Sequence, residues 1–439
     1  MKARLIPVYF EKGRNQEFDR QLDKLHQLLD DIAVILEPVA LGDRLPAGEA
    51  VVFPQLLGDA YREINKIKEI DLPILAITSE FGTVAMWDWE IVTFLRSRGL
   101  NTFAPFSPEI TRTICKTLAT IREMKTTRFL IYQDDPGEDG MQASIFKRFY
   151  WWEDEATRKI KDKFGIDIIY KSYRELGKRM EDISDSAARK ELNKRDIPAE
   201  DVSESAFLSA IKLYMAVRDD IDQLGNIGGV GMNCLNESFY SDTTPCLAWN
   251  LLFEERGIMW VCEGDTLSLL TKYIVYNSLG IPVIMSNVYP FLLGMAGLKH
   301  EKISSFPEVD EPENHLLVVH CGYFGLTPQS FAEEWTFRPK VLEIVDENAT
   351  MIDARMPEGS ITMTKIHPDL DKMMVVEGEL EGYVQYPGSD CRNGALIKVD
   401  DGYKLIDKFY SHHICFAQGK NSVELDIMAR LMDIEVDRV

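Results

Sequence analysis

Several predicted strands of this chain end in residues of the types that can bind divalent metal ions. Glu263 follows the apolar part of the strand predicted over 257–264, and Asn287 ends the next strand, predicted over 281–287. His320 ends the run HLLVVH, and the adjacent His412 and His413 lie in the strand-like segment FYSHHICFAQG. Because open parallel sheets bind ligands at the carboxyl ends of their strands, such side chains can share one site. A carboxylate, an amide and imidazoles suit an octahedral site for Mn²⁺, Mg²⁺ or Co²⁺.

The same residues also fit structural roles. Asp265 or Thr266 is placed to cap the helix predicted after the first of these strands. Asn287 stands close before a proline, as turn residues often do. A single histidine in a strand is more often a hydrogen-bonded core residue than a ligand. Both interpretations stay open at the level of the residues alone.

The histidine pair adds a constraint from strand geometry. Successive side chains of a strand point to opposite faces, so we expect only one of His412 and His413 to face the same interior as Phe416. One imidazole is then available as a ligand, and the other packs or supports it.

Other polar and aromatic residues are candidates for ligand contacts. Glu237 lies in the segment GMNCLNESFYSDTTP, where Asp242 or Thr243 could instead cap the following helix. Tryptophan and acidic side chains hold sugar rings by stacking and by hydrogen bonds, which makes three further residues candidates. These are Glu80, Trp87 and Trp89, in the segment TSEFGTVAMWDWE. The run NIGGVGMN matches neither common glycine-rich phosphate motif.

The pattern of apolar residues predicts the elements that position these side chains. Strands alternate with amphipathic helices in the first 300 residues, which indicates parallel sheets covered on both faces. Strands are predicted over 4–10, 50–54, 72–78, 128–133, 166–172, 257–264 and 281–287, and helices over 14–32, 173–195 and 203–224. From about residue 300 the runs are strand-like and separated by turn residues, and a helix closes the chain.

We therefore predict a mixed α/β protein of three domains. Two Rossmann-like or flavodoxin-like α/β domains span 1–125 and 126–300, and an antiparallel β-barrel spans 301–439. In this division Glu263 and Asn287 belong to the central domain, whereas His320 and His413 belong to the barrel.

Composition excludes several classes of function. A net charge of −22 over 439 residues argues against a nucleic-acid groove. No window reaches the roughly 18 apolar residues of a membrane span, and the N-terminus lacks the apolar core of a secretory signal. Seven scattered cysteines without a CxxC pair are typical of a cytoplasmic protein.

Three segments resemble the L-arabinose and L-fucose isomerases. CEGDTLSLLTKYI is similar to the stretch of that family in which a Glu at a strand end, followed by Gly-Asp, opens a helix. VVHCGYFG is similar to a segment that supplies a histidine ligand, and SHHICFAQGKNSVELDIMARLMDIE resembles the C-terminal His-His segment. The resemblance covers the C-terminal half, and the N-terminal half only in architecture.

The resemblance implies a manganese-dependent aldose–ketose isomerase that acts on a monosaccharide. It implies Glu263 as a metal ligand and catalytic carboxylate, and His320 and His413 as ligands, with His412 in support. It also implies a homotrimer or homohexamer, in which the segment around Trp87 and Trp89 could serve a neighbouring site.

One position departs from the family pattern. Asn287 stands where the family has a second catalytic carboxylate, and an amide can bind a metal ion but cannot act as a base. Three alternatives follow. Glu263 works alone or with Asp265 or Glu237, the metal supports other chemistry on a sugar, or the chain binds carbohydrate without turnover. A basic residue such as Arg338 or Lys299 could bind the anionic group of a sulfonated sugar.

Overall fold

The computed structural model describes residues 2–10, 14–78, 84–134, 149–290, 309–320, 326–340, 348–384 and 394–439. The chain divides into two compact units. The first comprises Met1–Glu123, Asn277–Leu279 and Asp426–Asp433, and the second comprises Met124–Tyr276, Gly280–Leu425 and Ile434–Val439. The finer division into three domains stays a prediction.

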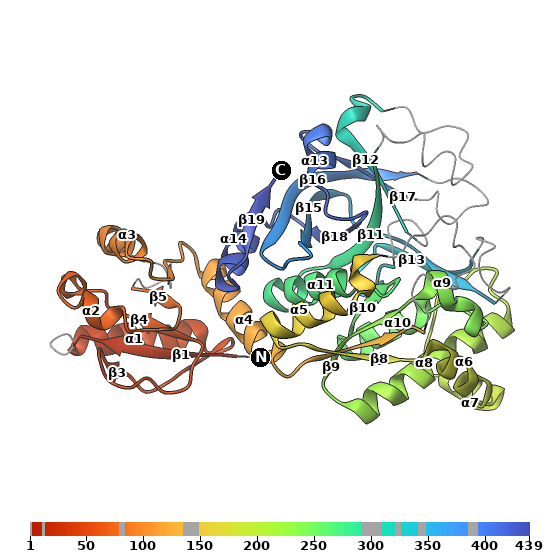
Figure 1. The fold of residues 1–439 in the computed structure, drawn as a ribbon, viewed down its shortest axis with the longest axis horizontal. Coiled ribbons are helices and arrows are strands. Elements are labelled where there is room, and N and C mark those ends of the chain that lie inside the picture. Colours follow the sequence, from red (N-terminus) through yellow and green to blue (C-terminus); the bar gives the residue numbers. More distant parts are fainter. Residues whose placement is uncertain are drawn as a thin grey trace. The chain divides into compact units, whose positions relative to one another are not determined.

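The first unit contains a parallel sheet (Figure 1). Its strands follow the order β2-β1-β4-β5-β6, which is the flavodoxin-like order of a doubly wound sheet. The strands are β1 (Ala3–Tyr9), β2 (Ala33–Ile35), β4 (Ala50–Phe53), β5 (Ile74–Ala76) and β6 (Thr102–Phe103), and β3 (Val39–Ala40) pairs with β1. The helices are α1 (Gln16–Leu29), α2 (Ile64–Ile67), α3 (Trp89–Ser97) and α4 (Pro108–Met124).

Alternation along β1 builds two cores in this unit. Leu5 packs in one cluster with Leu29 of α1 and Ile114 of α4. Ile6, the next residue, packs in the other cluster with Leu95 of α3. Because neighbouring residues of one strand serve opposite cores, both faces of the sheet are covered, as the apolar runs predict.

The second unit begins with another parallel sheet, of order β10-β9-β7-β8. Its strands are β7 (Arg128–Tyr132), β8 (Asp167–Lys171), β9 (Ile227–Met232) and β10 (Met259–Cys262). The helices are α5 (Asp154–Phe164), α6 (Tyr173–Glu181), α7 (Asp185–Leu192), α8 (Glu204–Leu224), α9 (Cys234–Glu237), α10 (Cys246–Arg256) and α11 (Thr266–Leu279). The single helix predicted over 173–195 is wrong, since Ser184 caps a new helix there through a hydrogen bond from the Ala187 amide.

A closed antiparallel barrel follows in the same unit. Six strands close the ring in the order β15-β18-β11-β12-β17-β16, and β16 pairs back with β15. They are β11 (Val283–Pro290), β12 (His315–Val319), β15 (Gly359–Ile366), β16 (Lys372–Val384), β17 (Gly394–Lys398) and β18 (His413–Gln418). Outside the ring lie β13 (Glu334–Pro339), β14 (Thr350–Arg355), β19 (Glu435–Arg438) and α13 (Gly402–Lys408). Helix α14 (Ser422–Leu431) begins in this unit, and its residues from Asp426 onward belong to the first unit. The predicted combination of parallel α/β sheets and a C-terminal barrel is confirmed.

One predicted strand belongs to a different sheet. The strand expected over 281–287 is β11, but it pairs antiparallel with β12 and β18. Asn287 is therefore a barrel residue, directly opposite His413 of β18, and not a residue of the central sheet. The apolar sequence of β11 fits either sheet, and only its partners distinguish them.

Helix α11 lies between the central sheet and the barrel (Figure 1). On the sheet side, the Tyr273 hydroxyl is 3.1 Å from the Thr127 hydroxyl, and a Cβ added to Gly228 would lie 2.7 Å from the Tyr273 ring. On the barrel side, the Ile366 amide donates to Thr271 Oγ1 at 3.2 Å. The glycines of NIGGVGMN thus belong to a strand, β9, on which α11 packs closely.

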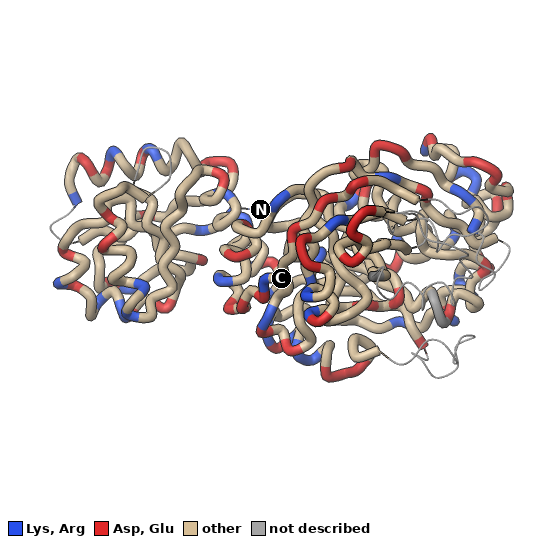
Figure 2. Tube along the Cα trace, turned by 90° about the horizontal axis from the view of Figure 1, so that it is seen from above, with Lys and Arg blue, Asp and Glu red and all other residues tan. Residues whose placement is uncertain are grey.

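Acidic residues are spread along both units (Figure 2), in line with the net charge of −22. Within the described residues, no helix is long and apolar enough to cross a membrane.

Candidate functional site

The site begins at the turn that joins β10 to α11. All four residues of β10 are buried, and the chain then turns through Glu263 and Gly264, whose φ angles are 55° and 62°. The Gly264 amide donates to the carbonyl of Met232 at the end of β9, at 3.0 Å. This turn places the Glu263 side chain at the carboxyl edge of the central sheet, where only 6% of its surface is exposed.

Asp265 caps α11, as one of the two interpretations of the sequence predicts. Its Oδ1 accepts hydrogen bonds from the amides of Leu267 and Ser268, at 3.1 and 2.9 Å. Its Oδ2 accepts from the Ser268 hydroxyl at 2.8 Å and from Nδ1 of His413 at 2.9 Å. Because an ionised carboxylate only accepts, His413 donates through Nδ1, and its Nε2 is left to face the site.

Lys365 of β15 completes the surroundings of Asp265. Its Nζ lies 2.7 Å from Asp265 Oδ2, and both side chains are fully buried. A buried pair of this kind is stable only when further hydrogen bonds support it, and the Ser268 hydroxyl also accepts from Lys365. Asp265 therefore carries four kinds of contact: to the helix end, to Ser268, to Lys365 and to His413.

Two imidazoles face the two oxygens of the Glu263 carboxylate. His413 Nε2 lies 3.4 Å from Oε2, and His320 Nε2 lies 4.0 Å from Oε1. The two rings are stacked, with centroids 6.2 Å apart. Across the barrel sheet, Asn287 is paired with His413, and its buried Oδ1 has no hydrogen-bond partner among the described residues. Three of the four predicted ligands, Glu263, His320 and His413, thus lie together, and the fourth, Asn287, lies opposite His413 on the neighbouring strand.

Two tryptophans contact residues of this cluster. The indole of Trp152 donates to the Glu263 carbonyl at 2.7 Å, and the ring of Trp151 stacks on His413 with centroids 5.1 Å apart. Lys365 Nζ lies 5.6 Å from the centroid of the same Trp151 ring. Neither tryptophan, nor Lys365, was among the residues predicted for the site. The aromatic run FYWW and a lysine inside a buried strand were the available signals, since a buried charge needs partners.

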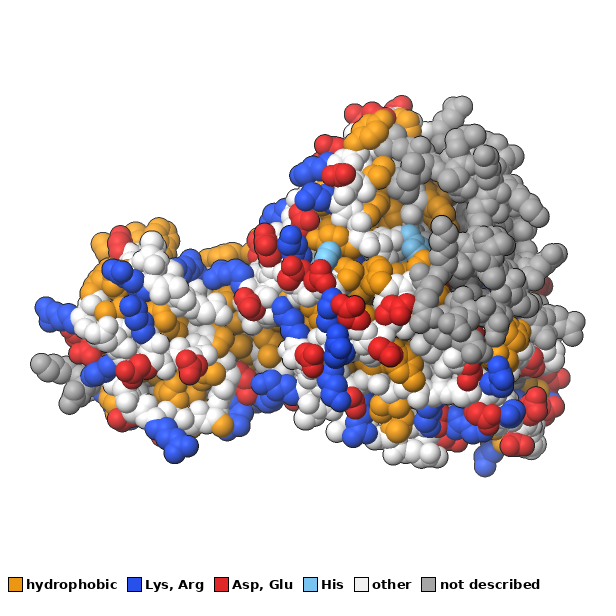
Figure 3. Space-filling view, in the orientation of Figure 1, with side chains coloured by type: hydrophobic (Ala, Val, Ile, Leu, Met, Phe, Trp, Pro, Cys, Tyr) orange, Lys and Arg blue, Asp and Glu red, His pale blue; other side chains and the backbone are white. Residues whose placement is uncertain are grey.

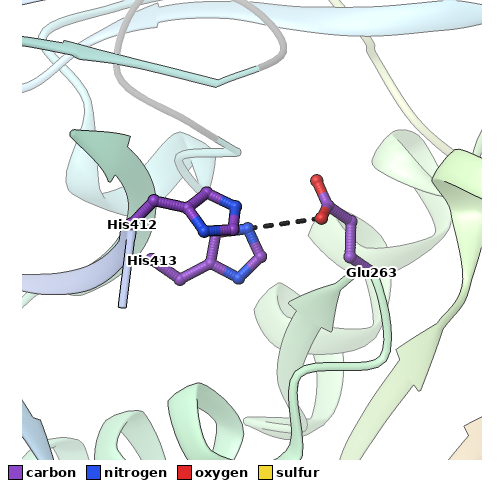
Figure 4. A group of neighbouring side chains, drawn as sticks. All are labelled: Glu263, His412 and His413. Carbon is purple, nitrogen blue, oxygen red and sulfur yellow. Dashed lines mark ion pairs between the residues drawn. The ribbon is translucent and has the colours of Figure 1, made fainter. Parts of the chain in front are cut away.

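His412 does not point away from the site, so the prediction from strand alternation is wrong. Strand β18 begins at His413, so the pleat does not extend to His412. The two rings are tilted against each other with centroids 4.2 Å apart. Figure 4 shows both imidazoles turned toward the Glu263 carboxylate, and ligand atoms of Glu263, His412 and His413 all lie within 4.8 Å of one another.

The charges of the cluster move the pKa values of its members apart. Burial alone would raise the pKa of Glu263, but the charge of His413 outweighs it and holds the pKa at about 2. Burial alone would lower the pKa of His413, but Glu263 and Asp265 raise it to about 9. Burial lowers the pKa of His320 to about 4. Burial alone would raise the pKa of Asp265, but Lys365 and His413 outweigh burial and hold this pKa well below its usual range.

The other predicted ligand-contacting residues lie in several places. Glu237 is buried and accepts the Asp134 amide with both carboxylate oxygens, at 3.0 and 2.8 Å. Arg338 of β13 forms ion pairs with Asp353 and Glu200, at 2.8 and 2.6 Å.

Trp87 and Trp89 are in the first unit, where 80% and 59% of their surfaces are exposed. Glu80 and Lys299 lie outside the described residues. The capping role predicted for Asp242 or Thr243 is wrong, since α10 has Pro245 at its N-cap and no side-chain cap.

The donor set fits a divalent metal ion. Ligand atoms about 2.1 Å from one ion are separated by about 3 to 4.2 Å, depending on whether they are adjacent or opposite. The separations of 3.4 and 4.0 Å between Glu263 and the two imidazoles lie in that range. The amide oxygen of Asn287, which has no hydrogen-bond partner in the described part of the chain, is a further donor beside His413.

Comparison of the sequence with protein-family models and with curated proteins gives no match.

Proposed function

We propose that this protein is a metal-dependent aldose–ketose isomerase that acts on a monosaccharide through an ene-diol. The convergence of Glu263, His320 and His413 carries the proposal, because these are the residues that the resemblance to L-arabinose and L-fucose isomerases implies as ligands. Asn287 would add an amide oxygen. A bound Mn²⁺, Mg²⁺ or Co²⁺ ion would polarise the oxygen atoms attached to the two carbon atoms between which the proton moves.

Glu263 is the base of this proposal. Its low pKa keeps the carboxylate ionised at neutral pH, and its two oxygens face the buried imidazoles of His320 and His413. In an ene-diol isomerisation a base takes the proton from one carbon and returns it to the neighbouring carbon. One carboxylate can do both when it lies on one side of the two carbon atoms.

Asp265 serves better as a positioning residue than as a second acid or base. Both of its oxygens already accept hydrogen bonds, and its ion pair with Lys365 opposes protonation. Glu237 is similarly engaged by the Asp134 amide. We therefore assign the proton transfer to Glu263 and the orientation of His413 to Asp265.

Isomerisation is tested by incubating the protein with Mn²⁺ or Co²⁺ and a panel of aldoses and sulfonated aldoses, in D₂O. We expect a ketose to form and deuterium to enter at the carbon next to the carbonyl. Glu263→Gln keeps the shape of the side chain but removes the base, and should lower the rate at least about 100-fold. Glu254→Gln, a change outside the cluster, is the matched control. If no sugar reacts and Glu263→Gln changes nothing measurable, the proposal fails.

One observation favours a second function, which is carbohydrate binding without turnover. Asn287 removes a carboxylate that the resemblance predicts, and neither Asp265 nor Glu237 has an uncommitted carboxylate to replace it. This function predicts that a sugar raises the melting temperature while no ketose forms and no deuterium is incorporated.

We further propose that the protein works in the cytoplasm as a homotrimer or homohexamer. The location is supported by the described cysteines, among which no disulfide forms. The assembly is supported by the resemblance and by the exposed tryptophans of the first unit.

A further inference from the structure

We infer that His412 is a third imidazole ligand of the metal ion, and that the site therefore prefers a nitrogen-binding ion such as Co²⁺ over Mg²⁺. This inference rests on the metal site of the proposed function but not on its isomerase activity. It replaces the supporting role that the sequence predicts for His412.

The geometry of the cluster is the first argument. Ligand atoms of Glu263, His412 and His413 lie within 4.8 Å of one another, close to the spacing of donors around a single ion. The two ring centroids are 4.2 Å apart, and both rings are turned toward the same carboxylate (Figure 4).

The position of His412 in the chain is the second argument. Its carbonyl accepts the Val288 amide at 2.9 Å, which fixes its backbone beside β11. Its ring lies 5.3 Å from the ring of Phe149 and 6.0 Å from that of Trp151. His412 is nevertheless exposed to solvent, unlike the fully buried His413. The ring is held by its neighbours and remains accessible to an ion that enters from solvent.

The charge of the donor set is the third argument. The cluster combines one carboxylate, Glu263, with the imidazoles of His412 and His413, and with His320 beside the other carboxylate oxygen. Asn287 contributes a neutral oxygen. Hard ions such as Mg²⁺ prefer several charged or neutral oxygen ligands, whereas imidazole favours ions later in the first transition series. A set rich in nitrogen and poor in carboxylate therefore selects Co²⁺ over Mg²⁺.

The experiment measures binding of Co²⁺ and Mg²⁺ to the metal-stripped protein, with the visible absorption of Co²⁺ as a report of its ligands. We expect the wild-type protein to bind Co²⁺ more tightly than Mg²⁺. His412→Ala should weaken Co²⁺ binding about tenfold or more and change the Co²⁺ spectrum, while Mg²⁺ binding changes less. Because His412 is exposed, the variant should keep its melting temperature.

Two further variants sharpen the test. His26→Ala removes another exposed histidine, in α1, and should leave Co²⁺ binding unchanged. His412→Asp supplies an oxygen donor, and should bind Mg²⁺ better relative to Co²⁺ than the wild-type protein does. The inference is overturned if His412→Ala binds Co²⁺ with wild-type affinity and spectrum. Absence of isomerase activity with normal Co²⁺ binding would overturn the proposed function and leave this inference standing.

Discussion

At the scale of single residues, the site is organised by one buried imidazole between two carboxylates. His413 donates to Asp265 through Nδ1 and faces Glu263 through Nε2, at 2.9 and 3.4 Å. The two carboxylates raise the pKa of His413 to about 9, although burial opposes this. At neutral pH the imidazole therefore holds a proton that a metal ion must displace before it can bind Nε2.

Metal binding should consequently release a proton and strengthen as the pH rises. Between pH 6 and 8 His413 is protonated, whereas Glu263 and His320, with pKa values of about 2 and 4, are already deprotonated. We expect about one proton per ion, and about a tenfold gain in affinity per pH unit in this range. Calorimetric titration with Co²⁺ in buffers of different ionisation enthalpy measures the number. An affinity that does not change between pH 6 and 8 would contradict this account.

The residues proposed as ligands could be predicted from the sequence better than the residues that hold them in place. Glu263 and Asp265 were found because they stand between a buried strand and a helix start, and His413 came from the resemblance. Lys365 was missed because its partner Asp265 is distant in the sequence and close only in the fold. The side chain of His412 was predicted to point away from that of His413, and this was wrong. The start of β18 depends on hydrogen bonding to β11, which the pattern of residues does not reveal.

At the scale of elements, helix α11 is capped by Asp265 of the site and also contains a buried lysine, Lys272. Lys272 of α11 is fully buried, and its Nζ donates to the Trp260 carbonyl at 2.9 Å and lies 3.2 Å from the centroid of the Trp260 ring. No carboxylate of the described residues forms an ion pair with it. Burial accordingly lowers the pKa of Lys272 to about 7.

Lys272→Met should stabilise the protein near neutral pH and lose this effect in alkaline solution. In the unfolded chain lysine has a pKa of about 10.4, so between pH 7 and 10 the unfolded state binds more protons than the native state. Native stability therefore rises with pH across this window, and the buried lysine costs about 4 kcal/mol at pH 7. Lys272→Met removes this cost but also removes the hydrogen bond and the contact with Trp260. The loss of these two interactions destabilises the variant by about 1 to 3 kcal/mol and so offsets part of the gain.

Denaturant unfolding at several pH values measures the difference in the free energy of unfolding between Lys272→Met and the wild-type protein. We expect the variant to be more stable than the wild-type protein by roughly 1 to 3 kcal/mol at pH 7, and no more stable at pH 10. Lys190→Met, at an exposed position of α7, should show no such dependence on pH. The same stability difference at every pH would show that Lys272 is not titrating near neutrality.

Elements with a strong periodic pattern of apolar residues were predicted correctly. Elements whose identity depends on the strands and helices that they pack against were not. The helix over 203–224 appears as α8, Glu204–Leu224, because its caps and its apolar face are local signals. Strand β9 was missed because three of its six residues are glycine, which strands usually avoid. Two of these glycines, Gly228 and Gly229, leave room for side chains of α11, a reason visible only in the packing. Strand β11 was found but given the wrong sheet, since any buried strand reads as an apolar run.

At the scale of the whole molecule, the first unit presents hydrophobic side chains that its own core does not use. Met86, Trp87 and Trp89, at and before the start of α3, are between 55% and 80% exposed. Figure 3 shows hydrophobic atoms at the surface over α3. On a chain of net charge −22, whose surface is otherwise rich in acidic groups, such side chains suit contact with another protein surface.

Self-association through these tryptophans is the corresponding prediction. Sedimentation at micromolar concentration should show a trimer or hexamer, and the double change Trp87→Ser and Trp89→Ser should dissociate it. Since both side chains are exposed, the stability of the first unit should change by less than about 0.5 kcal/mol. Tyr403→Ser removes an exposed aromatic ring of α13 and should leave the assembly intact. A monomeric wild-type protein would disprove the proposed assembly.

The backbone of Glu263 has a consequence for how this chain balances stability against activity. Its φ of 55° is in the left-handed region, which costs a residue with a Cβ atom about 1 to 2 kcal/mol and which glycine adopts readily. Selection for stability alone would therefore favour glycine here, and two consecutive glycines would form the turn. A glutamate at this position is a departure from the most stable sequence, and that is the signature of a residue retained for what its side chain does.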